Sequence, residues 1–85
     1  MKNKKYELVE DDFIIHEGRK LYRIKALKRL DSLRSLVIRG DLGGYVEGYH
    51  NLSQKGKCWI FDNAKVYGNA RVCGNAKIKN RAKVF

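Results

Sequence analysis

The chain has 85 residues, of which 44% are hydrophobic and 33% charged, and 19 Lys and Arg against 9 Asp and Glu give a formal net charge of +10. This composition is neither that of a disordered chain nor that of a membrane protein, since no apolar run approaches the roughly 20 residues of a spanning helix. Two cysteines, Cys58 and Cys73, are too few for a secreted disulfide scaffold. We therefore expect one domain, residues 1–85, with reduced thiols and a cytoplasmic location.

The high positive charge leaves two interpretations open. It favours anionic partners such as nucleic acid, nucleotides or acidic protein surfaces. The same lysines could instead keep a β-rich protein soluble and its sheet edges unpaired. A domain of this size buries only a modest fraction of its surface, so we also expect a partner or another source of stability.

The N-terminal segment has the alternation that is typical of antiparallel strands. A strand over residues 4–10 is broken at Asp11-Asp12, and a second apolar run over residues 13–16 leads to Glu17-Gly18. Alternation resumes over residues 19–28. The pattern predicts a hairpin with a two-residue, glycine-containing turn.

The segment that follows the hairpin admits a helix as an alternative. Leu27, Leu30 and Leu33 recur every three residues, which is compatible with a turn or two of helix over residues 30–36.

Three glycines in five residues, Gly40-Asp41-Leu42-Gly43-Gly44, are the strongest break in the chain. They predict a tight connection or a backbone that must approach another one closely. A phosphate loop fits poorly, because no Gly-Lys-Ser/Thr follows and the order of the glycines matches neither nucleotide fingerprint.

From about Asn63 onward the sequence repeats every six residues. Alanine stands at positions 64, 70, 76 and 82, and a Val or Ile follows each alanine two positions later. In a strand the two residues share a face, which predicts an inward-facing pair. Gly68, Gly74 and Asn80 hold equivalent positions, where a left-handed backbone would turn a corner. Such a repeat predicts a β-solenoid whose units stack into a continuous core.

The repeat resembles the hexapeptide repeat of left-handed β-helices, in which three units make a triangular coil of about 18 residues. It is most similar to phage and prophage proteins that carry runs of G-N-A-[RK]-V-x. The segments Tyr6–Leu8, Gly18–Leu27, Gly40–Gly44 and Asn51–Gln54 resemble the N-terminal region of those proteins. One departure is that glycine follows Val by two positions, whereas it follows by one in the acyltransferase repeat.

The expected fold is all-β, with residues 1–44 as a cap of antiparallel strands on a short solenoid of about two coils, residues 45–85. Residues 18 apart would then stack about 4.8 Å from one another. The predicted inward columns are Val46/Ala64/Ala82, Gly48/Val66/Val84, Leu52/Ala70, Cys58/Ala76 and Ile60/Ile78. Gln54 over Val72 breaks the pattern and indicates an irregular first coil. The predicted outward columns are Tyr49/Tyr67/Phe85, Glu47/Lys65/Lys83, Phe61/Lys79 and Trp59/Lys77.

The basic residues of the repeats are the candidate binding residues. Six of them and no acid follow Ala64, and a triangular coil sends successive repeats to different faces, so the charge forms a collar rather than a stripe. This disfavours a protein that recognises duplex DNA, because such a protein needs a basic stripe and an element that fits a groove of the DNA. With one aromatic residue beside them, the candidates are Lys65, Arg71, Lys77, Lys79, Lys83 and Trp59.

Residues that could perform catalysis are few. The histidines are His16 and His50, the carboxylates show no paired spacing, and no Cys/His cluster indicates a metal. We expect no enzyme, no cofactor and no metal site. A degenerate hexapeptide-repeat acyltransferase with His50 as its base is the weakest alternative.

Resemblance and charge together predict a non-enzymatic inhibitory protein of phage type, of the anti-CRISPR or another anti-defence kind, in the cytoplasm of the host bacterium. It would bind a bacterial defence protein, a nucleic-acid complex or a nucleotide through its basic and aromatic surface, and no membrane. A self-assembling structural solenoid is the alternative. Because no polar capping segment follows the last repeat, we expect a homodimer through the C-terminal coils. The residues expected in that contact are Tyr67, Ala82, Val84 and Phe85.

Overall fold

Short β-strands make up nearly all of the regular structure. The computed structural model describes residues 4–32 and 35–85, and within these ranges it contains nine strands and one 3-10 turn. The expectation of an all-β fold is confirmed at this level. No helix of the described residues is long and apolar enough to cross a membrane. The elements are β1 (Tyr6–His16), β2 (Arg19–Ala26), β3 (Leu30–Ser32), β4 (Ser35–Val37), β5 (Leu42–Val46), η1 (Tyr49–Asn51), β6 (Trp59–Ile60), β7 (Lys65–Val66), β8 (Lys77–Ile78) and β9 (Lys83–Val84).

The first hairpin forms where the sequence predicts it. β1 and β2 pair antiparallel around Glu17-Gly18, and both turn residues have positive φ, 51° and 78°. Two successive left-handed residues are the geometry of a type I′ turn, which matches the twist of the flanking strands. Asp11-Asp12 does not end the strand as expected: it lies in a register shift between Val9 and Phe13, so β1 is irregular there but continues.

A second, smaller hairpin stands where a helix was the alternative. β3 and β4 pair antiparallel, with Leu30 opposite Val37, and both of these side chains are buried in the main core. The helical alternative is therefore wrong for the described part of residues 30–36, because Leu30 enters the core from a strand. Leu33 lies outside the described residues.

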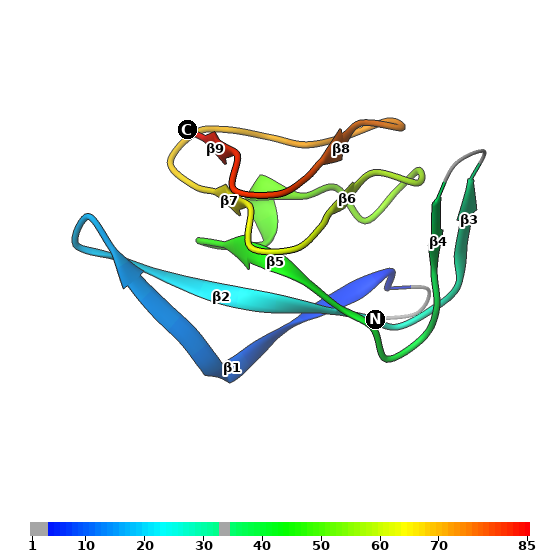
Figure 1. Ribbon diagram of the computed structural model, residues 1–85, viewed down its shortest axis with the longest axis horizontal. Helices are drawn as coiled ribbons and strands as arrows, with labels where there is room; N and C mark the ends of the chain where they lie inside the picture. Colours follow the sequence, from blue (N-terminus) through cyan, green and yellow to red (C-terminus); the bar gives the residue numbers. More distant parts are fainter. Residues whose placement is uncertain (1–3, 33–34) are drawn as a thin grey trace.

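One five-stranded sheet joins the hairpin to the repeat region, residues 45–85. Its strand order is β1-β2-β5-β7-β9, antiparallel as far as β5 and parallel from β5 to β9. Figure 1 shows β5, β7 and β9 one above another, with β2 and β1 below them. β6 and β8 form a separate parallel pair, and a further parallel bridge joins Leu52 to Val72.

Left-handed residues recur every six positions and turn the chain. They are Asp62, Gly68, Gly74 and Asn80, with φ of 58°, 65°, 65° and 64°. Close to each one, a β-turn is closed by the N–H of the next alanine, which donates to a carbonyl three residues earlier. The corner role predicted for Gly68, Gly74 and Asn80 is confirmed, and Asp62 joins them. The four turn bonds run from Ala64 to Phe61, Ala70 to Tyr67, Ala76 to Cys73 and Ala82 to Lys79.

The predicted spacing of 18 holds only in the later part of the repeat region. Upstream, the partners are 20 residues apart, because two extra residues lie between Ser53 and Lys57. The predicted columns for Val46, Gly48 and Leu52 are therefore wrong by two positions. The observed 18-residue partners are Trp59/Lys77, Ile60/Ile78, Lys65/Lys83 and Val66/Val84, and the 20-residue partners are Tyr45/Lys65, Val46/Val66 and Leu52/Val72.

Gln54 marks the place of the two extra residues. Its side chain does not lie in the column of Val72; its Oε1 accepts the N–H of Lys5 at 2.7 Å and that of Tyr6 at 3.3 Å. The insertion thus ties the repeat region to the start of β1. The irregularity that Gln54 predicted is confirmed here as a change from 20-residue to 18-residue partners.

The main hydrophobic cluster contains side chains from both parts of the chain, among them Tyr6, Ile24, Val46, Trp59 and Val66. The strands on the two sides of this core can pack closely because β5 carries two glycines, Gly43 and Gly44, where it contacts the repeats.

A Cβ added to Gly43 would lie 2.6 Å from the Ile60 carbonyl oxygen, and one added to Gly44 would lie 2.5 Å from that of Ala64. The close backbone approach predicted for these glycines is confirmed.

Candidate binding surface

Strands β7 and β9 place two lysines side by side. Lys65 and Lys83 are direct register partners; Lys83 is exposed and Lys65 partly exposed. The Lys65 Nζ donates to the Asn63 carbonyl oxygen at 3.3 Å. Like charges directly opposite each other destabilise paired strands. The Lys65/Lys83 part of the predicted charged column is thus confirmed, and it places two lysines in register with each other.

The remaining basic residues of the repeats have no carboxylate partner in the part of the chain that the structure describes. Within residues 4–32 and 35–85, the ion pairs are Arg19–Glu47, Arg23–Asp12, Arg29–Asp31 and His16–Glu17, and none includes a Lys or Arg that follows Ala64. The Lys77 Nζ donates to the Asn75 carbonyl oxygen at 3.1 Å. The Lys79 Nζ lies 6.0 Å from the centre of the Phe61 ring, which confirms that predicted pair.

Trp59 occupies its predicted register position but not the surface. Its backbone pairs with Lys77, yet the residue is only 1% exposed. The ring of Tyr6 packs edge-on against it with ring centres 6.4 Å apart, because the N-terminal strand covers this face of β6. The prediction of Trp59 as a surface binding residue is therefore wrong.

Two of the three residues in the predicted aromatic ladder stack on each other. Tyr67 and Phe85 stack with ring centres 5.3 Å apart and planes 14° from parallel. Tyr49 does not join them, because the two-residue insertion moves it out of the column and it packs against Tyr6 instead, at 5.6 Å. Tyr67 is 3% exposed, so it is not available for the expected self-association contact, whereas Phe85 is 79% exposed.

In the 20-residue register Glu47 lies over Tyr67, which is the position predicted for Tyr49. Glu47 therefore does not lie over Lys65, as the predicted charged column required. Its Oε1 accepts the Gly68 N–H at 2.8 Å and an Arg19 N–H at 2.9 Å. The Gly68 hydrogen bond, and after it the charge of Arg19, hold the pKa of this carboxyl below its usual range. Glu47 thereby joins β2 to the corner at Gly68.

Arg71 lines a groove of about 360 Å³ that the sequence did not predict. The other lining residues are Tyr49, His50, Ser53, Val72 and Cys73, and no acid is among them. The His50 Nε2 lies 2.9 Å from the Gly68 carbonyl oxygen, a contact that requires a proton on that nitrogen. His50 therefore closes a corner of the repeat. The only sequence signal for the groove was that Gln54 did not fit its column; the resulting 20-residue offset brings Arg71 beside this segment.

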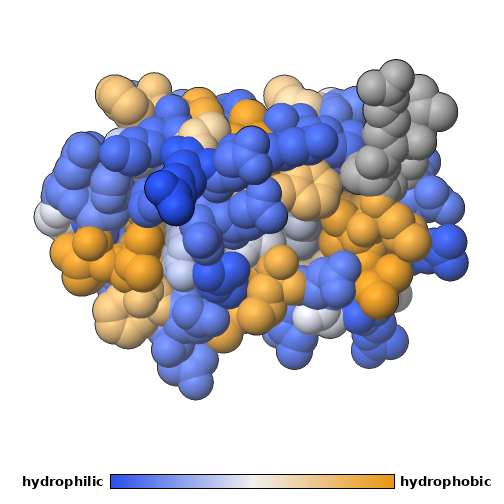
Figure 2. All heavy atoms as spheres, viewed as in Figure 1, coloured by the Kyte–Doolittle hydropathy of each residue, from blue (hydrophilic) through white to orange (hydrophobic). Residues whose placement is uncertain are grey.

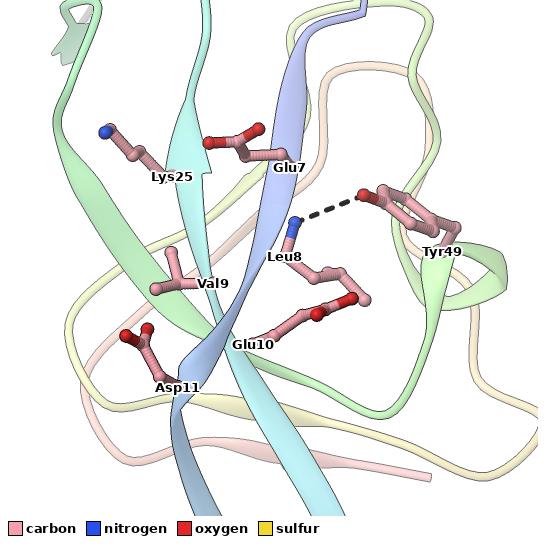
Figure 3. Close-up of a pocket in the computed structure, with 7 residues that line it drawn as sticks. All are labelled: Glu7, Leu8, Val9, Glu10, Asp11, Lys25 and Tyr49. Carbon is pink, nitrogen blue, oxygen red and sulfur yellow. Dashed lines mark hydrogen bonds between the residues drawn. The ribbon is translucent and has the colours of Figure 1, made fainter.

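A second hollow, of about 640 Å³, is lined by acidic residues, unlike the groove at Arg71 (Figure 3). The start of β1 contributes three carboxylates to it, and Lys25 lies beside Glu7 as its register partner. The Tyr49 hydroxyl accepts the Leu8 N–H at 3.3 Å across this hollow. Among the described residues, no group of three or more His, Cys, Asp or Glu could hold a metal ion. The residues that line the hollow are Glu7, Leu8, Val9, Glu10, Asp11, Lys25 and Tyr49.

Figure 2 shows hydrophilic residues over much of the surface, with several separate hydrophobic patches. The hollow on the hairpin is lined by three carboxylates and one lysine, whereas the groove beside the repeats is lined by Arg71 and by no acid. Comparison of the sequence with protein-family models and with curated proteins finds no match. The resemblance to phage repeat proteins therefore stays a prediction.

Proposed function

We propose that this protein is a non-enzymatic binding protein of the phage inhibitory kind, which occupies an anionic surface of a bacterial component. Its repeats form a short, left-handed β-solenoid of about two coils, and the hairpins serve as its cap. Parallel partners 18 residues apart and a left-handed residue every six positions support this reading of the repeats.

The observation that carries the proposed function is the register pair of Lys65 and Lys83. Two lysines in register with each other do not stabilise a sheet, and the described residues provide no carboxylate that pairs with either of them. An anionic partner would remove this repulsion on binding. Lys77, Lys79 and Arg71 extend the positive charge to other faces, which fits a partner that surrounds the repeats better than a straight duplex.

The experiment is an affinity pull-down from bacterial lysate with the full chain, performed with and without nuclease. A partner that survives nuclease is a protein, and one that is lost with nuclease is bound through nucleic acid. The variant Lys65→Glu/Lys83→Glu should lose the partner. A control with the same change in charge, Lys28→Glu/Arg39→Glu, alters exposed residues outside the repeats and should retain it.

Two results would contradict the proposal. Equal loss in both double variants would mean that net charge alone attracts the captured material. Absence of any captured component above the level of a bead control would remove the binding function.

Self-association is a second candidate, supported by the exposure of Phe85 and by the edge positions of β8 and β9 in their sheets. Unpaired strand edges are templates for a further strand, which a second copy could supply. The expected dimer should appear in light scattering and weaken in Phe85→Ser. A strict monomer at high concentration would eliminate this candidate.

A further inference from the structure

Lys5 is buried, and no carboxylate among residues 4–32 and 35–85 pairs with it. The residue is 0% exposed. Its Nζ donates to the Cys58 carbonyl oxygen at 2.9 Å and to that of Lys55 at 3.5 Å. Lysine is almost never fully buried unless it is paired, so its remaining contact is of interest.

That remaining contact is a thiol. The Lys5 Nζ lies 3.1 Å from the Cys58 Sγ, and both residues are fully buried. The same sulfur lies 3.5 Å from the Val72 carbonyl oxygen, which can accept the thiol proton. The contact therefore holds an amine and a thiol together inside the protein, 53 positions apart in the chain.

The surroundings favour the reactive form of the amine. Burial lowers the pKa of Lys5, and the charges of Lys28 and Lys77 act in the same direction, although the contact with Cys58 opposes them. A neutral amine has a free electron pair and is a nucleophile, whereas an ammonium group is not. Lys5 thus has a larger neutral fraction than a surface lysine.

We propose that Lys5 and Cys58 are the site of a peroxide-dependent covalent cross-link. In the first step peroxide transfers one oxygen to the Cys58 thiol, which becomes a sulfenic acid, and one water is released. In the second step the Lys5 nitrogen attacks the sulfur. A sulfur–nitrogen bond forms, the sulfur–oxygen bond breaks, and the oxygen leaves as water with a proton from the amine. The protein loses two hydrogen atoms in total, and peroxide is reduced to two waters.

The geometry favours the sulfur–nitrogen link over the other products that a sulfenic acid can form. Condensation with an amine needs the nitrogen beside the sulfur, and Nζ is already in contact. The other cysteine, Cys73, is exposed, whereas Cys58 is buried. The cross-link would fasten the residue before β1 to the residue before β6. This inference is independent of the proposed binding function.

The test uses the full native chain treated with dilute hydrogen peroxide, cleaved at acidic residues and analysed by tandem mass spectrometry. A peptide with Lys5 should be joined to a peptide with Cys58, at their summed mass less two hydrogens, and a thiol reductant should separate them. The same pair joined with one additional oxygen, which a second equivalent of peroxide supplies with release of one more water, also supports the site. Cys58 found unmodified, as a free sulfenic or sulfinic acid, or in a disulfide would overturn the proposal, as would attachment to Lys4.

Three controls separate this reaction from general oxidation. In the guanidinium-unfolded chain the yield should fall roughly tenfold or more, because contact raises the effective concentration of the amine. Cys73→Ser removes the exposed thiol and should leave the link intact. Lys5→Arg should abolish it, since a guanidinium is not a nucleophile near neutral pH. Mapping of the unsubstituted protein decides the question even where Lys5→Arg does not fold.

Discussion

Gly44→Ala should be among the most destabilising single-methyl substitutions in this protein. The added Cβ would lie 2.5 Å from the Ala64 carbonyl oxygen and 2.5 Å from Ile60 Cγ2, so β5 must move away from β7. One extra methyl group in a packed core costs about 1–3 kcal/mol. Displacement of β5 also weakens the 2.9 Å hydrogen bond from the Tyr45 N–H to Ala64, worth about 1 kcal/mol.

The expected loss in the free energy of unfolding is therefore about 2–4 kcal/mol, a large share of the stability of a domain of this size. Urea titration followed by the fluorescence of the single tryptophan, Trp59, measures it, because this buried residue becomes exposed on unfolding. Leu42→Ala, also in β5 but at a 55% exposed residue, is the matched control and should change stability by about 0.5 kcal/mol or less. A value for Gly44→Ala within 1 kcal/mol (about the error of such comparisons) of the control would refute the close approach.

Four further predictions concern charge and hydrogen bonding. Tyr6→Phe should lower stability by about 1–3 kcal/mol, because the Leu52 carbonyl loses the hydroxyl that donates to it at 2.5 Å; an unchanged urea midpoint would contradict this. Burial raises the pKa of Tyr6, so as the pH rises this hydroxyl loses its proton in the unfolded chain before it does so in the folded protein. Stability should therefore decline as the pH rises above the usual pKa of tyrosine, and in Tyr6→Phe that decline should be smaller. Glu47 has a lowered pKa, so its contribution is present above the usual glutamate pKa and is lost as pH falls through its folded value; thermal melts should find Glu47→Gln less stable than the parent near neutral pH and closer to it in acid. Lys65→Glu places a negative charge in register with Lys83, where the parent protein has two positive charges. It should raise the free energy of unfolding by about 0.2–1 kcal/mol at low salt, and high salt should remove this gain.

Local rules explain what the sequence predicted well. The Glu17-Gly18 turn, the corners at Gly68 and Gly74, and the close approach at Gly43-Gly44 each depend on what one or two residues permit the backbone to do. Such preferences are visible in the sequence without knowledge of the rest of the fold.

Long-range packing explains what it missed. The two extra residues before Lys57 shift every upstream column, and the sole sign of them was that Gln54 did not fit its position. Trp59 is buried because Tyr6, far away in the chain, covers it. The Lys5–Cys58 contact has the same origin. A repeat predicts its own periodicity but not the segment that packs against it.

If the repeats are the solenoid proposed above, their 18-residue spacing would allow the protein to be lengthened in steps. Lys65 and Lys83 begin the neighbouring parallel strands β7 and β9 and are register partners. A copy of residues 65–82 inserted before Lys83 would therefore begin and end at structurally equivalent positions. Each copy would lengthen the molecule by one strand spacing, about 4.8 Å, and leave the hairpins and Gly43-Gly44 unaltered. The lysine row would grow by one member per copy, so charge and length would increase together.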